Sequence, residues 1–261
     1  MNEQIRHGSR GSVALFITCL VDLFRPSVGF AAVQLLEQAG YRVDVPEAQT
    51  CCGQPAYNSG DSDTAAGVAA QVIRTFSEYD YVVVPSGSCA ATIIVHYPDL
   101  LRHDPALQSA ARDLADRTWE LTRFLAEVAD IEVRDTSFDG KVAYHDSCSG
   151  LRELGIREQP RELLAGVHGL RLQEMEDRDV CCGFGGTFCV KYPEISERMV
   201  DNKLDAIRDT GASTLLSGDL GCLLNMAGRM YRRGMHVRAY HVAEVLAGMG
   251  DEPAIGEGRK R

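Results

Sequence analysis

Nine cysteines are the residues of this chain whose type and spacing point to chemistry. Two adjacent pairs are each followed by glycine, at Cys51-Cys52-Gly53 and at Cys181-Cys182-Gly183. Neighbouring side chains on an extended strand point to opposite faces, so both thiols reach one centre only where the chain leaves strand geometry. Glycine accepts the positive φ values that such a turn can need. Each triplet therefore predicts a turn that presents two thiols to one place.

A further cysteine precedes and follows each triplet, with nearly the same spacing in both halves. Cys19 precedes the first triplet with 31 residues between, Cys148 precedes the second with 32 between, and Cys89 and Cys222 follow them. Cys189 has no counterpart, and we expect it to be a small apolar packing residue. The repeat predicts two sets of four metal-binding thiols: Cys19, Cys51, Cys52 and Cys89, then Cys148, Cys181, Cys182 and Cys222.

Four thiolates in one place suit soft metals, which include zinc, copper(I) and iron–sulfur clusters. Structural zinc sites usually use two close Cys-x-x-Cys pairs. Here one pair is directly adjacent and the other two cysteines are distant, which fits zinc poorly and favours an iron–sulfur cluster in each half. Zinc remains the alternative. Disulfides are disfavoured because the chain shows no signal peptide, so we expect it in the cytoplasm, where thiols stay reduced.

Four polar residues near these cysteines are candidates for supporting the metal. Ser86 and Asp219 come three residues before Cys89 and Cys222. Either could stabilise a ligand or supply an oxygen ligand, and either could instead cap a helix or make a turn. His145 and Asp146 lead into Cys148 and could orient a ligand or relay protons. The alternative is a packed histidine and a capping aspartate at a strand end.

Composition and charge exclude several classes of function. The chain has 261 residues, 45% of them hydrophobic and 25% charged, as in an ordinary soluble globular protein long enough for two domains. The formal net charge of −10 argues against general binding to nucleic acid. No apolar run approaches the ~18 residues that a transmembrane helix needs. No Gly-x-Gly-x-x-Gly follows a predicted strand, so no nicotinamide or flavin site is visible.

Apolar patterning predicts strands that alternate with helices, hence an α/β fold with a small, mainly parallel sheet in each half. In such sheets ligands bind beyond the carboxyl ends of the strands, where we expect the cysteine loops, with Cys89 and Cys222 near the starts of the helices that follow. Residues 104–129 are helical in pattern, with a break near Arg117, and can join the halves, and 138–140 give a turn signal. We predict strands at 13–17, 41–45, 81–84, 141–145, 170–173, 214–216 and 237–240. The expected organisation is a first domain at 1–130, a second at 131–250 and a polar tail at 251–261.

The cysteine pattern resembles the CCG-type cysteine-rich family, which includes the B subunit of heterodisulfide reductase and the iron–sulfur subunit of glycolate oxidase. The final Cys-x-x-Cys of that family reads Ser86-Gly87-Ser88-Cys89 in the first half and Asp219-Leu220-Gly221-Cys222 in the second. Each lacks its first cysteine. The non-cubane cluster and disulfide cleavage of heterodisulfide reductase therefore do not carry over directly.

With the run Tyr144-His145-Asp146-Ser147-Cys148, the chain is most similar to the lactate utilisation protein A family. That resemblance implies a cytoplasmic three-protein system that oxidises L-lactate to pyruvate. This chain would be its non-catalytic or co-catalytic iron–sulfur electron-transfer subunit, with one 4Fe–4S cluster in each half. Its partners would be a larger iron–sulfur protein and a third subunit. Two other functions stay open: a thiol/disulfide oxidoreductase and a zinc-binding assembly subunit.

Overall fold

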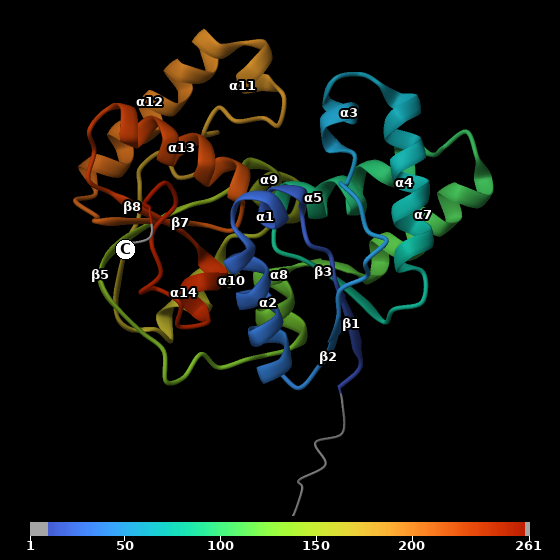
Figure 1. The fold of residues 1–261 in the computed structure, drawn as a ribbon, viewed down its shortest axis with the longest axis horizontal. Helices are drawn as coiled ribbons and strands as arrows, with labels where there is room; N and C mark the ends of the chain where they lie inside the picture. The colour runs from blue at the N-terminus through green and yellow to red at the C-terminus, as the bar shows by residue number, and fades with distance from the viewer. Residues whose placement is uncertain (1–9, 259–261) are drawn as a thin grey trace, which may run out of the picture.

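Two four-stranded sheets, one from each half of the chain, form the frame of the molecule (Figure 1). The computed structural model describes residues 10–258. The strand orders are β2-β1-β3-β4 and β6-β5-β7-β8, and every neighbouring pair is parallel. The predicted α/β class is therefore confirmed. The strands are β1 (Ser12–Leu15), β2 (Arg42–Asp44), β3 (Tyr81–Val84), β4 (Thr118–Glu120), β5 (Ser137–His145), β6 (His168–Gln173), β7 (Thr214–Ser217) and β8 (Arg238–His241).

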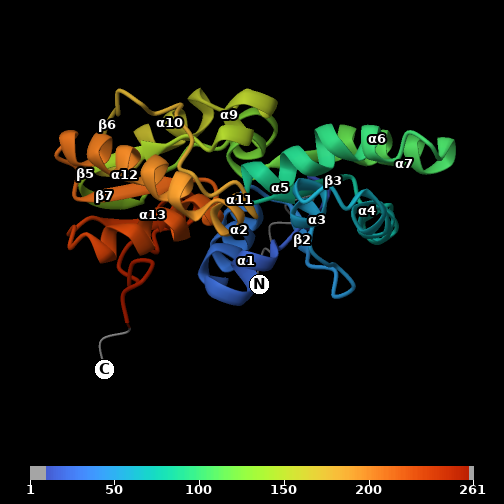
Figure 2. The ribbon, with the colours of Figure 1, turned by 90° about the horizontal axis from the view of Figure 1, so that it is seen from above.

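Helices connect the strands and flank both sheets, as Figure 2 shows from above. In the first half they are α1 (Cys19–Phe24), α2 (Pro26–Gln38), α3 (Gln54–Asn58), α4 (Ser62–Phe76), α5 (Gly87–Ala91), the π-helical turn η1 (Thr92–His96), α6 (Tyr97–Leu100), α7 (Pro105–Arg117), α8 (Leu121–Arg123) and the π-helical turn η2 (Phe124–Val128). In the second half they are α9 (Cys148–Leu154), α10 (Glu158–Ala165), α11 (Phe188–Lys191), α12 (Pro193–Asp209), α13 (Leu220–Arg232) and α14 (Val242–Leu246).

The central strands are apolar because helices cover both of their faces. In β3, Val82, Val83 and Val84 are all fully buried, and β7 is buried along its whole length. Strands buried on both faces read as continuous apolar runs, which is why the sequence pattern found them.

Among the predictions about local structure, one break was confirmed, one strand was missed and one turn was wrong. The predicted break near Arg117 in the helical segment 104–129 is confirmed, because α7 ends at Arg117, but the sequence did not reveal that Thr118–Glu120 form β4 beside β3. Thr118 ends the helix with its hydroxyl bonded to the Leu114 carbonyl, and the Glu120 side chain caps the next helical turn. The turn signal at 138–140 lies inside β5, where the pairing with β6 shifts register between Ser137 and Gly140. The glycine therefore marks a β-bulge, not a turn.

The two halves share one hydrophobic core. It joins Val13 and Leu15 of β1 to Val142 and Tyr144 of β5. Helix α2 of the first half packs on α14 of the second, and α10 of the second packs on α8 and η2 of the first. Each half therefore covers an apolar face of the other.

The predicted polar tail is only partly solvent-exposed. Ala254 is buried in the shared core, and the Ile255 N–H donates to the Ala239 carbonyl at 2.9 Å beside β8. Its basic end, residues 259–261, lies outside the described residues. Among helices within residues 10–258, none combines the length and apolar character needed to cross a bilayer.

Candidate metal centres

All eight repeated cysteines follow the carboxyl end of a strand. Cys19 and Cys148 open α1 and α9, and Cys89 and Cys222 lie in the first turns of α5 and α13. The predicted loop position holds for the two adjacent pairs and the predicted helix starts hold for Cys89 and Cys222, while Cys19 and Cys148 also begin helices. Free backbone N–H groups at a helix start favour the thiolate form of a cysteine.

The four thiols of the first set form a continuous chain of contacts. The Cys19 and Cys51 sulfurs are 3.9 Å apart, and those of Cys52 and Cys89 are 3.4 Å apart. The Cys51 and Cys52 thiols also interact. Cys19 and Cys51 are half-buried, whereas Cys52 and Cys89 are buried. Cys52 and Cys89 therefore form a buried inner edge of the set, and Cys19 and Cys51 form an outer edge that reaches the surface.

The second set repeats this order. Thiol interactions link Cys148 to Cys181, Cys181 to Cys182, and Cys182 to Cys222. The outer pair, Cys148 and Cys181, is half-buried and the inner pair is buried. None of the nine cysteines, all within the described residues, forms a disulfide. The structure thus brings each predicted quartet together.

Glycine lets the adjacent cysteines face one centre, as the sequence predicts. Gly53 and Gly183 have φ values of +80° and +83°. The Gly183 N–H also turns back to donate to the Cys181 sulfur at 3.4 Å.

The electrostatics of each quartet favour a bound cation. A hydrogen bond from Cys19 lowers the pKa of Cys51 to about 2, and one from Cys148 lowers the pKa of Cys181 to about 2. Interaction with Cys51 raises the pKa of Cys52 well above its usual value. One thiolate in a quartet therefore opposes ionisation of its neighbours, and a metal would remove that opposition. The donors fit a thiolate-held metal ion or cluster.

Ser86 and Asp219 hold the cysteine turns of both halves. One Asp219 carboxylate oxygen accepts from the Gly221 N–H at 3.1 Å and caps α13. The other accepts from the Ser88 N–H at 2.9 Å and the Ser86 hydroxyl at 3.1 Å. Ser86 in turn caps α5 by accepting from the Cys89 N–H at 3.3 Å. Both side chains are buried. They are capping residues that also join the two halves.

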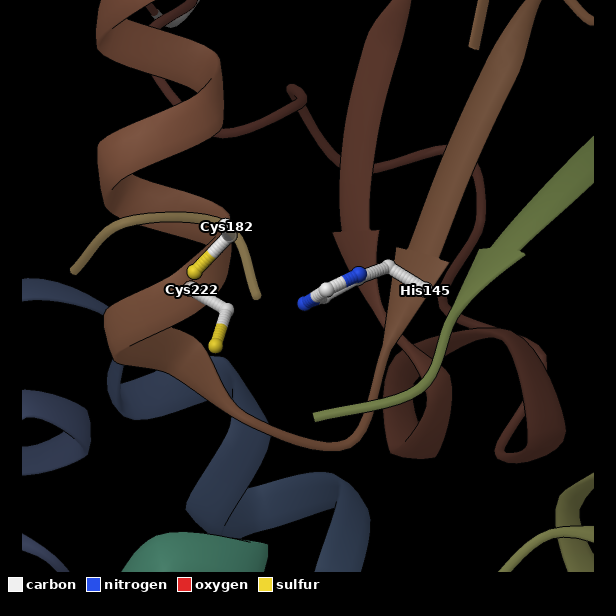
Figure 3. A group of neighbouring side chains, drawn as sticks. All are labelled: His145, Cys182 and Cys222. Atoms are coloured by element: carbon white, nitrogen blue, oxygen red, sulfur yellow. The ribbon is translucent and has the colours of Figure 1, made fainter. Parts of the chain in front are cut away.

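His145 and Asp146 differ from one another in surroundings. His145 ends β5 and is fully buried, with a ring nitrogen and the Cys182 and Cys222 sulfurs all within 4.8 Å of one another (Figure 3). Burial lowers its pKa to about 3, so the ring is neutral. Asp146 instead forms a two-armed ion pair with Arg161, at 2.8 and 2.9 Å. Its carboxylate supports the fold beside Cys148.

Sequence reasoning missed Lys203, a buried cation near the second set. Its ammonium group donates to the Asp177 carbonyl, and its charge acts on Cys182. It lies on the apolar face of α12 with Val200 and Leu204. A lysine at an apolar helical position was the signal that could have found it. Cys189, predicted to be a packing residue, is half-buried on α11.

Two parallel sheets of one strand order, each with a Cys, Cys-Cys-Gly, Cys set at its carboxyl edge, define a duplicated cysteine-rich α/β protein. The Cysteine-rich domain family, CCG, matches residues 13–94 and 142–227. A crystal structure of a hypothetical protein from Helicobacter pylori has a similar fold, with a TM-score of 0.63 at 12% identity. It covers 93% of this chain, which spans 49% of that structure.

Relatives of known name match over almost their whole length. Lactate utilization protein A of Geobacillus kaustophilus is 50% identical over 234 residues, which is 90% of this chain and 98% of the relative. The Bacillus subtilis protein of the same name is 47% identical with the same coverage. The chain belongs to the lactate utilization protein A family of CCG cysteine-rich proteins.

Proposed function

We propose that this chain is an iron–sulfur electron-transfer subunit of a cytoplasmic system that oxidises L-lactate to pyruvate. The names of its relatives support a role in lactate utilisation. The observation that carries the redox role is the pair of four-thiol sets, each with a half-buried outer edge and a buried inner edge.

Each quartet would hold one cluster, proposed as 4Fe–4S, and a bound cluster supplies reversible one-electron transfer. The residues of the chain do the rest. The buried inner pairs, Cys52 with Cys89 and Cys182 with Cys222, keep water from one side. The Gly183 N–H donates to the Cys181 sulfur, which favours its thiolate. Hydrogen bonds to sulfur also help to set a cluster's potential.

The outer edges offer routes to partner proteins. An open groove beside the first set is lined by Cys19 and Cys51 and by Leu23, Val45 and Pro46. Leu23 is 72% exposed, so a partner that covers this face would bury apolar surface close to the thiols. The proposed partners are two further lactate-utilisation subunits, one of them a larger iron–sulfur protein.

Metal analysis of protein purified without oxygen tests the proposal. We expect two clusters per chain by iron and sulfide content and by visible absorption. Cys51→Ser/Cys52→Ser and Cys181→Ser/Cys182→Ser should each remove about half of both signals. Cys189→Ser, outside both quartets, is the matched control and should keep them. Less than one cluster per chain, with zinc in its place and a colourless protein, would support the zinc-binding assembly function instead.

Lactate metabolism is tested separately. A strain that lacks this gene should fail to grow on L-lactate and should recover with the wild-type chain. Recovery with both double-serine variants would mean that neither quartet is needed.

One observation favours a second function, thiol/disulfide exchange. Cys51 and Cys181 are half-buried and have lowered pKa values, and an accessible thiolate is the nucleophile of that reaction. Two thiols of a quartet would become a disulfide while the substrate disulfide is reduced to two thiols. Turnover of a small disulfide by the isolated chain with a dithiol reductant would favour this function, and inactivity would reject it.

A further inference from the structure

The imidazole of His145 is a buried polar group without a hydrogen-bond partner in the described part of the chain, and a bound metal would explain its position. The side chain is fully buried, and neither ring nitrogen has a hydrogen-bond partner within residues 10–258. Buried polar groups are nearly always paired, so an orphaned one calls for a missing partner such as an ion. In Figure 3 the ring points toward the sulfurs of Cys182 and Cys222.

We propose that His145 is a direct ligand of the metal held by the second cysteine set, which makes the two centres chemically different. This inference rests on the proposed function only in requiring that the second set binds a metal. A ring nitrogen and two cysteine sulfurs within 4.8 Å of one another can share one ion. Imidazole is a common metal ligand through either ring nitrogen, and both ring nitrogens of His145 lack a hydrogen-bond partner among the described residues.

Three charged groups around the second set are already engaged. Both carboxylate oxygens of Asp219 accept hydrogen bonds from the protein, and Asp146 is paired with Arg161. Lys203 is a cation and donates to the Asp177 carbonyl. Among these residues, His145 is therefore the one whose ligand atom remains free to join the four thiols.

The first set has no equivalent of this ring. When the two halves are aligned on Cys19 and Cys148, which open α1 and α9, His145 corresponds to Phe16. Phe16 is fully buried, and its ring centroid lies 5.3 Å from that of Phe76. The first centre therefore has sulfur ligands alone. Where imidazole takes the place of one thiolate at an iron–sulfur centre, the reduction potential rises, so a second centre in which His145 displaces one of the four thiolates should be the easier to reduce.

Zinc-loaded protein tests the assignment without depending on a cluster or on lactate. The Cys51→Ser/Cys52→Ser chain disables the first set, and the thiol-reduced apoprotein is loaded with one equivalent of Zn²⁺. X-ray absorption at the zinc edge should show sulfur plus one imidazole. Adding His145→Phe, which copies the first half, should remove the imidazole scattering. It should also weaken zinc binding at least about tenfold, the loss seen even for an outer-sphere partner.

His241 provides the matched control. It is also fully buried and ends β8, which lies two strands from β5, but its Nδ1 accepts from the Ala243 N–H at 3.2 Å and caps α14. His241→Asn preserves a capping oxygen, and its zinc spectrum should keep the imidazole.

An all-sulfur zinc shell in the chain that retains His145 overturns the proposal, even if His145→Phe fails to fold. That result leaves the iron–sulfur function standing. Conversely, absence of iron from anaerobically purified protein, together with normal zinc–imidazole scattering, overturns the function and leaves the His145 assignment in place.

Discussion

The Asp219 carboxylate accepts a hydrogen bond from the Ser86 hydroxyl at 3.1 Å, across the boundary between the two halves. These residues occupy the same position in the two repeats, three residues before Cys222 and Cys89. Through this contact and the Ser88 N–H, one side chain fixes the start of α13 and the turn that leads into α5. The two metal centres therefore share a structural support.

Replacing Asp219 by Asn should weaken both cysteine turns. The amide has one acceptor oxygen, so a buried N–H or hydroxyl loses its partner, and we expect the free energy of unfolding to fall by about 1–3 kcal/mol. Urea denaturation of the reduced apoprotein measures this. Asp61→Asn, at the exposed N-cap of α4, should change stability little, because Asn and Asp cap equally well. Equal effects of the two changes would contradict the shared support.

Adding a methyl group to the two triplet glycines should harm the second half more. Both φ values are positive, which costs an L-residue roughly 1–2 kcal/mol. A Cβ on Gly183 would lie 2.8 Å from the Ser196 carbonyl oxygen, whereas a Cβ on Gly53 would meet the Val68 side chain at 3.2 Å. Gly183→Ala should therefore destabilise the protein more than Gly53→Ala. Thermal denaturation of the two variants measures this difference. A lower melting temperature for Gly53→Ala than for Gly183→Ala would show that the Val68 side chain moves aside less readily than the backbone at Ser196.

Glu120 should make stability fall as pH rises. Burial raises its pKa from the usual 4.5 to about 7, with a smaller contribution from the charge of Asp219. The folded state then holds a proton that the unfolded state releases from about pH 4.5 upward. Its contribution is complete below pH 4.5 and is lost as pH rises through 7, for a total of about 3 kcal/mol.

Urea denaturation of the wild-type chain and Glu120→Gln, from pH 4.5 to 7.5, measures the Glu120 contribution. Gln keeps an acceptor for the Thr122 hydroxyl and the Arg123 N–H, so it should fold. The difference in unfolding free energy should move in favour of Gln by about 3 kcal/mol across this range. A difference that stays constant with pH would refute the raised pKa.

Removing Arg161 should be costly because Asp146 would keep a buried charge. Asp146 is 2% exposed and Arg161 12%, and breaking a buried ion pair typically costs about 3–5 kcal/mol. We expect Arg161→Met to lose most of that amount in urea denaturation. Arg161→Met/Asp146→Asn removes the unpaired charge and should recover part of the loss. No recovery in the double variant would mean that the arginine acts mainly through Glu174, its other partner.

The sequence was most informative where a pattern repeats or a strand is buried on both faces. Thus the eight cysteines and the apolar strand Tyr81–Val84 could be placed in advance. Strand β4 has three residues, Thr118–Glu120, which are too few for any periodicity to register. The bulge at Gly140 gives the same local signal as a turn.

Contacts between the halves were beyond what the sequence alone could predict. The spacing of Ser86 and Asp219 to the cysteines was visible, but their mutual hydrogen bond joins residues 133 positions apart. The burial of Ala254 likewise depends on a core built by both halves. Local patterns carry no information about which helix of one half covers the other.

The crossed helix packing between the halves has the reciprocal form of an isologous dimer interface. Helix α5, which carries Cys89, meets α9, which carries Cys148, while α1 with Cys19 meets α13 with Cys222. In a two-fold symmetric dimer of identical subunits, a contact between surface i of one subunit and surface j of the other likewise occurs a second time with the two subunits exchanged. A gene split after codon 130 should accordingly yield two polypeptides that are each insoluble when expressed alone and reassemble when co-expressed.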